Sequence, residues 1–283
     1  AASFNEIIAE GYGKPQSARE FTELAQWVNY DGHRSLFESR SKNRMGLLMW
    51  MSHPCWPSMV WQTYDYYLEP PAAYFAIKKA SEPLHIQWNP ATDEVEVVNY
   101  SAGTHSHLTA RVQILNMDAS VAWEKETTVD SREDTTEKCI KLEFPETLSE
   151  VYFIKLWLLE DGKILSDNFY HASRKGINYQ ALKQLPEVTL DCQAKVAQDK
   201  EGNWTATVTL TNPTSTPALM TRINVVGDKD GDQFLPILYE DNYFALLPGE
   251  QKEVSVRWKD VDTRGNSPVI RITGYNVKEL SRQ

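Results

Sequence analysis

The sequence of 283 residues predicts a mainly β protein, in which two immunoglobulin-like β-sandwiches follow a helix–strand–helix remnant of a TIM (β/α)8 barrel. Three observations lead to this prediction. Apolar residues with helical spacing are confined to residues 1–80, the period changes to two from residue 82 onward, and a polar stretch at residues 172–186 divides the alternating part into two sets. We therefore expect domains at residues 1–80, 81–175 and 186–283.

The helical signals begin at Ser17, which forms a capping box with Glu20. The apolar positions that follow have the i, i+3, i+4, i+7 spacing of one buried helical face and resume after a weak point at Gly32: Phe21, Leu24, Ala25 and Val28, then Leu36 and Phe37. This pattern predicts a helix over residues 17–41.

A continuous apolar run at residues 45–51 is typical of a strand that is covered on both faces. Residues 68–80 return to helical character behind two prolines, which are tolerated at a helix start. A helix, a buried strand, a loop and a second helix make one repeat of an α/β barrel.

The remaining sequence alternates between apolar and polar side chains in short runs, as half-buried strands do. The first set of runs is residues 94–98, 108–115, 139–144 and 151–159. The second set is residues 188–196, 204–210, 219–226, 253–258 and 269–275. Several short strands divided by turn residues over about 100 residues predict an immunoglobulin-like sandwich, so each set predicts one.

Charge and composition exclude some functions. The formal net charge of −10 argues against a nucleic-acid partner, because phosphate binding needs a basic surface. No apolar run approaches the length of a membrane-spanning helix, and no signal peptide is recognisable, although the start at Ala1 could be an excision point. Three scattered cysteines predict free thiols rather than a disulfide framework.

Two regions carry a specific resemblance. The first comprises Gly46-Leu-Leu-Met-Trp-Met, Trp56-Pro-Ser, Trp61-Gln-Thr-Tyr-Asp-Tyr-Tyr67, Ala73-Tyr-Phe, Lys78-Lys-Ala and Glu82-Pro-Leu-His-Ile-Gln87. The second comprises Leu235-Pro236 and Tyr239-Glu-Asp-Asn-Tyr-Phe-Ala-Leu-Leu-Pro-Gly-Glu250. Together these motifs resemble glycoside hydrolase family 2, in particular its exo-β-D-glucosaminidase and β-mannosidase-like members.

The resemblance implies that this chain is the C-terminal part of a retaining exo-β-glycosidase that acts on glucosamine- or mannose-type sugars. In that family a jelly roll and a sandwich precede the barrel, further sandwiches follow it, and the two catalytic glutamates lie on barrel strands four and seven. Residues 17–41 then correspond to the seventh barrel helix and residues 47–51 to the eighth strand. Both catalytic glutamates would lie upstream of Ala1.

No pair of carboxylates in the sequence has a reason to replace those glutamates. A retaining glycosidase needs two carboxyl groups about 5–5.5 Å apart. Asp65 and Glu69 are four residues apart near a helix start, where capping or an interaction with the helix dipole is a sufficient explanation. We therefore expect no catalytic residue in this chain, and we expect neither a cofactor nor a metal site.

The predicted substrate-binding residues are Trp50, Ser52, His53 and Trp56. The resemblance places Trp50 beneath the sugar, whose apolar C–H face can stack on an indole plane; the alternative is a tryptophan of the barrel core. Trp56 and Trp61 could line the rim of the pocket or serve packing. Ser52 and His53 stand where relatives carry an Asn-rich turn, which bears on the choice of sugar.

The expected partners are the carbohydrate substrate and the remainder of the barrel. Residues 1–80 would otherwise expose apolar surface, so we expect them to pack on the first sandwich or to form a homodimer contact. The resemblance favours a periplasmic or secreted parent enzyme. The alternative function is a non-catalytic carbohydrate-binding or adhesion module, which an exposed row of aromatic side chains on one sandwich face would support.

Overall fold

A computed structural model describes residues 2–39, 46–57 and 62–282. Its internal contacts divide the chain into two compact units. Unit 1 consists of residues 1–15, 28–49 and 76–184, and unit 2 consists of residues 16–27, 50–75 and 185–283. The predicted domain boundaries stay a prediction. Within the described ranges, no helix combines the length and the apolar character needed to cross a membrane.

The helices are α1 (Ala2–Tyr12), α2 (Ala18–Ser39) and α3 (Ala72–Ala80). The capping box is present: the Glu20 amide donates to Ser17 Oγ at 3.1 Å, while the Glu20 carboxylate accepts from the amide of Gln16 at 2.6 Å. Gly32 does not interrupt α2. The predicted buried face is correct at Leu24, which is fully buried, but wrong at Leu36, which is 49% exposed.

The strand expected over residues 45–51 is a wrong prediction for the described part of that segment. Residues 46–57 form no strand, and the Leu48 side chain is fully exposed; Met45 lies outside the described residues. A strand exists only through hydrogen bonds to a neighbouring strand, and no described strand pairs with residues 46–51. The apolar run therefore indicates that the segment is suited to burial. It does not identify the element that would bury it.

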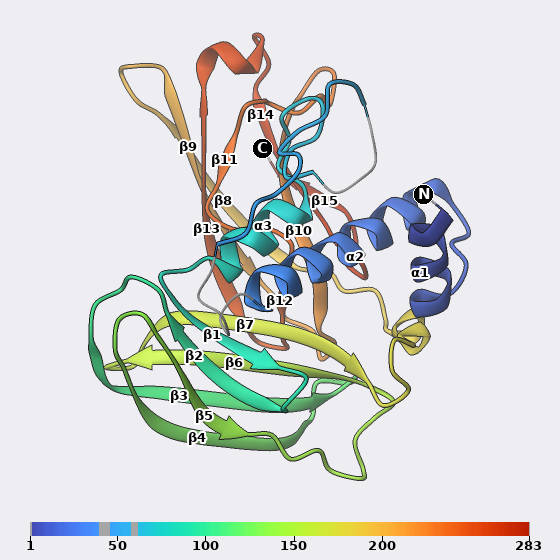
Figure 1. The fold of residues 1–283 in the computed structure, drawn as a ribbon. Coiled ribbons are helices and arrows are strands. Elements are labelled where there is room, and N and C mark those ends of the chain that lie inside the picture. Colours follow the sequence, from blue (N-terminus) through green and yellow to red (C-terminus); the bar gives the residue numbers. More distant parts are fainter. Residues whose placement is uncertain (1, 40–45, 58–61, 283) are drawn as a thin grey trace. The chain divides into compact units, whose positions relative to one another are not determined.

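Unit 1 contains an antiparallel sandwich (Figure 1). One sheet has the order β1-β2-β5, with β1 (Leu84–Asn89), β2 (Glu94–Asn99) and β5 (Thr135–Lys141). The other has the order β4-β3-β6-β7, with β3 (His105–Asn116), β4 (Val121–Ser131), β6 (Val151–Glu160) and β7 (Lys163–Ser173). The core lies between the sheets and includes Ile86 and Val97 from one and Val112, Ile154 and Leu156 from the other.

Unit 2 contains a second sandwich. Its sheet β12-β10-β14-β15 is made of β10 (Ala218–Gly227), β12 (Phe244–Leu246), β14 (Pro268–Thr273) and β15 (Leu280–Arg282). Its sheet β11-β13-β9-β8 is made of β8 (Asp191–Gln198), β9 (Asn203–Thr211), β11 (Leu238–Tyr239) and β13 (Gln251–Lys259). The alternating side chains Val208 and Val254 are fully buried, as the period of two predicts.

The polar stretch at residues 172–186 is more ordered than the sequence suggests. Strand β7 continues to Ser173, and a 3-10 helix, η2, spans Gln180–Gln184 with Leu182 buried.

All three cysteines are free, as predicted.

Candidate functional site

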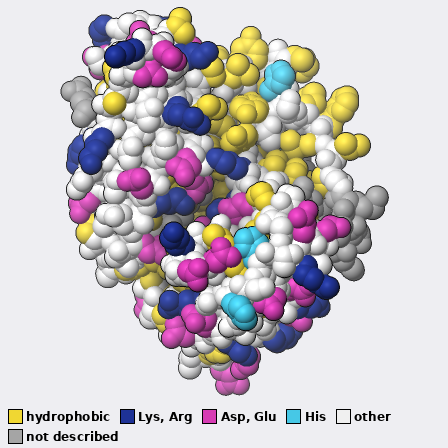
Figure 2. Space-filling model, turned by 90° about the vertical axis from the view of Figure 1, so that its left-hand side faces the viewer, with side chains coloured by type: hydrophobic (Ala, Val, Ile, Leu, Met, Phe, Trp, Pro, Cys, Tyr) yellow, Lys and Arg dark blue, Asp and Glu magenta, His cyan; other side chains and the backbone are white. Residues whose placement is uncertain are grey.

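The largest exposed aromatic side chains of unit 2 belong to one connection. Residues 50–57 and 62–69, which we call the aromatic loop, carry Trp50 at 81% exposure, Trp56 at 69% and Tyr67 at 63%. Hydrophobic side chains gather in one region of the surface shown in Figure 2. Exposed apolar patches of this kind mark binding surfaces, and aromatic planes open to solvent can stack on the C–H faces of sugars.

The four predicted binding residues all lie in the aromatic loop and are exposed. The hydroxyl of Ser52 and Nδ1 of His53 are 3.1 Å apart, so these two side chains form a polar pair between Trp50 and Trp56. The peptide bond that follows Trp50 is cis. Trp61 lies outside the described residues. That these residues contact a sugar stays a prediction.

The backbone of Ser52 anchors the first half of the aromatic loop to the second. Its carbonyl oxygen accepts hydrogen bonds from the amides of Thr63 and Tyr64 at 3.0 and 2.9 Å, and from the Thr63 hydroxyl at 3.0 Å. Sequence analysis identified Ser52 through its side chain and missed this backbone role, because hydrogen bonds to a carbonyl leave no residue-type signal.

Asp65 closes the second half of the aromatic loop. Its Oδ1 accepts hydrogen bonds from the amides of Tyr67 and Glu69, each at 2.8 Å, and its own amide donates to the Glu69 carbonyl at 3.0 Å. Burial raises the pKa of Asp65, although the two amides partly offset that effect. The predicted capping role of Asp65 is thus a turn-closing role.

The carboxylate of Glu69 pairs with the sandwich of unit 2. It accepts hydrogen bonds from Nη2 of Arg222, from the side-chain Nδ2 of Asn224 at 3.3 Å and from the side-chain Nε2 of Gln233 at 2.6 Å. Arg222 and Asn224 are two residues apart on β10, so their side chains project from the same face of the sheet. Burial opposes the charge of Arg222, but Tyr243 and Glu69 outweigh it and raise its pKa. We call these contacts of Glu69 the clamp. Sequence analysis missed it, because the donors lie about 150 residues or more from Glu69 in the sequence.

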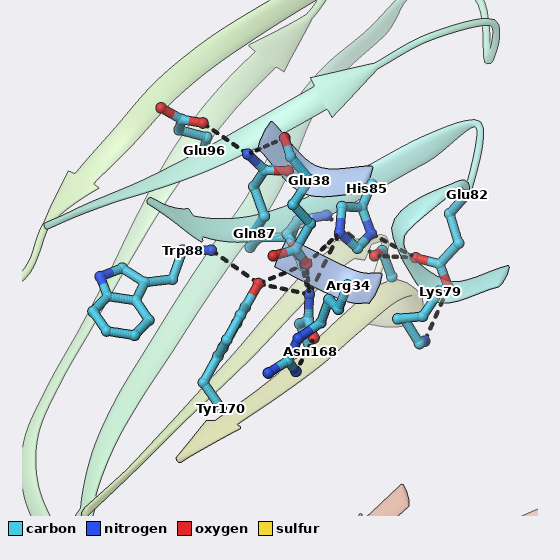
Figure 3. Close-up of polar contacts among 12 residues, drawn as sticks. Arg34, Glu38, Lys79, Glu82, His85, Gln87, Trp88, Glu96, Asn168 and Tyr170 are labelled. Carbon is cyan, nitrogen blue, oxygen red and sulfur yellow. Dashed lines mark hydrogen bonds and ion pairs between the residues drawn. The ribbon is translucent and has the colours of Figure 1, made fainter. Parts of the chain in front are cut away.

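Unit 1 holds a second polar centre, shown in Figure 3, around the buried carboxylate of Glu38 near the C-terminus of α2. One oxygen of Glu38 accepts from Nε2 of His85 at 3.1 Å, from the side-chain Nδ2 of Asn168 at 2.8 Å and from the Tyr170 hydroxyl at 2.9 Å. His85 comes from β1, while Asn168 and Tyr170 come from β7. The network therefore joins a helix to both sheets of the sandwich.

The imidazole ring of His85 lies between two carboxylates of this network. Its Nδ1 lies 3.1 Å from Oε2 of Glu82, so the ring bridges two carboxylates. Burial disfavours the protonated ring, but the hydrogen bonds to Glu38 and Glu82 outweigh it and raise the pKa of His85. Burial would raise the pKa of Glu82, yet His85 and Lys79 lower it. The two carboxylates thus favour the protonated form of His85 more than in an ordinary histidine.

Arg34 lies one helical turn before Glu38 and faces the same side of α2. Its guanidinium donates to the Asn168 side chain at 3.3 Å and to Asp31 at 2.8 Å, and it stacks 4.1 Å above the Tyr170 ring. A hollow of about 1300 Å³ borders these residues. Since Glu38, His85 and Asn168 direct their polar atoms at one another, the network favours a structural role: it fixes the second half of α2 on the sandwich.

Residues of types that can bind an ion have partners within the protein instead. Nδ1 of His105 pairs with Glu160 at 2.8 Å. In the segment 228–232, the side chain of Asp230 accepts from the amide of Asp232 at 2.9 Å, which is a turn contact. No group of three or more His, Cys, Asp or Glu side chains within the described ranges is arranged to hold a metal ion.

Comparison with known proteins gives consistent matches. Residues 168–277 match the family model described as the exo-β-D-glucosaminidase Ig-fold domain. Exo-β-D-glucosaminidases of Streptomyces avermitilis and Amycolatopsis orientalis are 32% and 31% identical over 98% and 97% of this chain. A mannosylglycoprotein endo-β-mannosidase of Lilium longiflorum is 24% identical over 95% of it. The chain spans 34%, 29% and 35% of the lengths of these three relatives.

Solved structures agree. The crystal structure of an exo-chitosanase of Amycolatopsis orientalis has a TM-score of 0.92 at 28% identity, and the match covers 99% of this chain and 36% of that one. A variant of that exo-chitosanase in complex with PNP-β-D-glucosamine has a TM-score of 0.91 at 28% identity. A β-D-mannosidase of Dictyoglomus thermophilum has a TM-score of 0.72 at 17% identity and shares the fold.

Proposed function

Because the chain is related to the C-terminal part of exo-β-D-glucosaminidases of glycoside hydrolase family 2, we propose that it serves as the C-terminal part of a retaining exo-β-glycosidase. The substrate is a glucosamine- or mannose-type β-glycoside. The chain contributes the aromatic loop to the sugar-binding side and two sandwiches that brace the barrel. The two catalytic glutamates lie in the remainder of the enzyme, so this chain alone is inactive.

The observation that carries this proposal is the coverage of the matches. Nearly the whole chain aligns with the glucosaminidase of Streptomyces avermitilis, but it accounts for only 34% of that protein. The exposure of Trp50 and Trp56 supports a role in sugar stacking. The pairing proposed for residues 1–80, with the remaining barrel or with a second copy of the chain, rests on the same exposed apolar surface.

The alternative, an independent carbohydrate-binding or adhesion module, receives less support. Such a module would present a row of aromatic side chains on a sandwich strand. Among the described residues, the most exposed aromatic side chains belong to the aromatic loop. The large hydrophobic side chains that the strands expose are aliphatic: Val121, Ile164, Leu165 and Leu238.

Hydrolysis of nitrophenyl β-glucosaminide and nitrophenyl β-mannoside tests the proposal directly. This chain is assayed beside a longer version that includes the whole barrel. Activity only in the longer version supports the proposal and identifies the sugar. Activity in this chain alone contradicts the placement of the catalytic glutamates, and inactivity of both versions contradicts a glycosidase role.

Replacing Trp50 with alanine in the longer version will raise KM for the nitrophenyl glycoside about tenfold, which corresponds to roughly 1.4 kcal/mol of lost stacking. Trp50→Phe keeps an aromatic plane, so its KM will rise less. Val261→Ala is the control, because Val261 is 78% exposed on unit 2 but lies outside the aromatic loop. An unchanged KM in Trp50→Ala would contradict stacking on the sugar and would favour a packing role for this residue.

A further inference from the structure

Glu69 belongs to two structures of unit 2 at once. Its backbone is part of the turn that carries the exposed rings of Tyr66 and Tyr67, because its amide and carbonyl both bond to Asp65. Its side chain is only 15% exposed and belongs to the sandwich, where its two oxygens accept hydrogen bonds from Arg222, Asn224 and Gln233. A single residue thus ties the aromatic loop to strand β10.

The tie reaches the other half of the aromatic loop through adjacent residues. Thr63 and Tyr64 directly precede Asp65, and both donate to the carbonyl of Ser52, two residues after Trp50. A continuous path of hydrogen bonds and short backbone steps therefore runs from β10 through Glu69 and Asp65 to the segment that bears the indole ring.

The three donors around Glu69 require a carboxylate. Both of its oxygens accept, one from a guanidinium and the side-chain amide of Asn224 and the other from the side-chain amide of Gln233. A glutamine at this position would turn its own NH2 group toward one set of donors and lose the charge that balances Arg222. An aspartate would keep the charge and shorten the reach by one methylene.

We propose that Glu69 is a positioning residue for sugar binding: by joining β10 to the aromatic loop, it lets the C-terminal sandwich set the place of the loop's aromatic rings. This inference rests on the proposed glycosidase function for its effect on the substrate, but not for its effect on the loop. It gives the C-terminal sandwich a role in substrate affinity, in addition to bracing.

The effect on the loop is measured by hydrogen exchange in the chain as it stands. Glu69→Gln is expected to speed exchange of the Tyr67 and Glu69 amides about tenfold or more, since these bonds then open without the clamp. Exchange in β10 and β13 should change little. Glu253→Gln is the matched control, because Glu253 is an exposed glutamate of β13. Unchanged exchange at Tyr67 and Glu69 would overturn the proposal.

The effect on sugar binding is measured in the longer version of the enzyme. Glu69→Gln should raise KM about tenfold while kcat stays within roughly threefold, and Glu69→Asp should recover part of the loss. Faster exchange with an unchanged KM would overturn the role in sugar binding. If the longer wild-type enzyme is inactive, the proposed function fails, while the exchange result still decides whether Glu69 holds the loop.

Global unfolding of Glu69→Gln would show as fast exchange throughout β10 and β13. In that case Gln233→Ala replaces it, since this variant removes one donor at 2.6 Å and leaves the ion pair with Arg222 in place. Selective loss of protection at Tyr67 and Glu69 in Gln233→Ala supports the proposal, and retained protection there contradicts it.

Discussion

Replacing Glu38 with alanine will destabilise unit 1 by on the order of 3 to 5 kcal/mol, the usual cost of breaking a buried charge pair from one side. The variant leaves the buried His85 ring with one carboxylate partner instead of two, and it deprives Asn168 and Tyr170 of the oxygen to which they donate. His85 and Asn168 are 0% and 3% exposed, so water cannot replace the lost acceptor without opening the sandwich.

Hydrogen exchange of β6 amides under increasing urea measures this loss within unit 1. Glu38→Gln keeps an acceptor oxygen but loses the charge, and we expect it to fall between the wild type and Glu38→Ala. Glu10→Ala is the control, because Glu10 is an exposed helical glutamate of the same unit. A loss below about 1 kcal/mol in Glu38→Ala would place the network among weak surface pairs.

The sequence predicts best those elements whose side chains face a core at a regular period. Strands β9 and β13 alternate over nine residues each and were predicted, as was α2 with its capping box. Strand β4 was missed because its exposed side chains leave the alternation weak, and β11 was missed because two residues show no period.

Apolar runs predict that a segment is suited to burial, but not which element buries it. The run at residues 45–51 was therefore assigned to a strand, although its described part pairs with no other strand. In a similar way, the alternation through β1 predicts a strand only if His85 and Gln87 are taken as its polar face. The structure buries both of them under α2, where they meet Glu38.

The candidate site shows the same difference between features that are local in the sequence and contacts between distant residues. Trp50, Ser52, His53 and Trp56 stand within seven residues, so their proximity is visible in the sequence. The donors to Glu69 and Glu38 are brought together by tertiary folding across 47 to 164 residues. No local pattern records such contacts, so the sequence predicts the aromatic loop but neither the partners of Glu69 nor those of Glu38.

Unit 1 will lose stability as the pH rises above about 6.5, the ordinary pKa of histidine. His85 faces Glu38 from α2, Glu82 from the segment before β1, and Asn168 from β7. The carboxylates raise the pKa of His85 in the folded state despite its burial. Between the ordinary and the raised pKa, the folded chain holds a proton that the unfolded chain has released, so stability falls with pH over that window and levels off above it.

At acid pH the stability of unit 1 changes in the opposite direction: it falls as the pH decreases. Burial lowers the pKa of His171, and the partners of Glu82 lower the pKa of that carboxyl despite its burial. Their contributions are present above the ordinary pKa of each group and are lost as the pH falls. The contributions of His171 and Glu82 thus fall as the pH decreases, whereas the contribution of His85 falls as the pH increases.

Urea midpoints of unit 1 between about pH 5 and pH 9 separate these contributions. His85→Gln should lower the stability at neutral pH and flatten the alkaline fall, because the proton that is bound preferentially by the folded state has gone. His33 lies on α2, so His33→Gln on this helix is the control, since the His33 ring bonds to the carbonyl of Asn29 within its own helix. If His85→Gln kept the wild-type slope above pH 6.5, the cation would not lie between Glu38 and Glu82, and the network would be held by neutral hydrogen bonds alone.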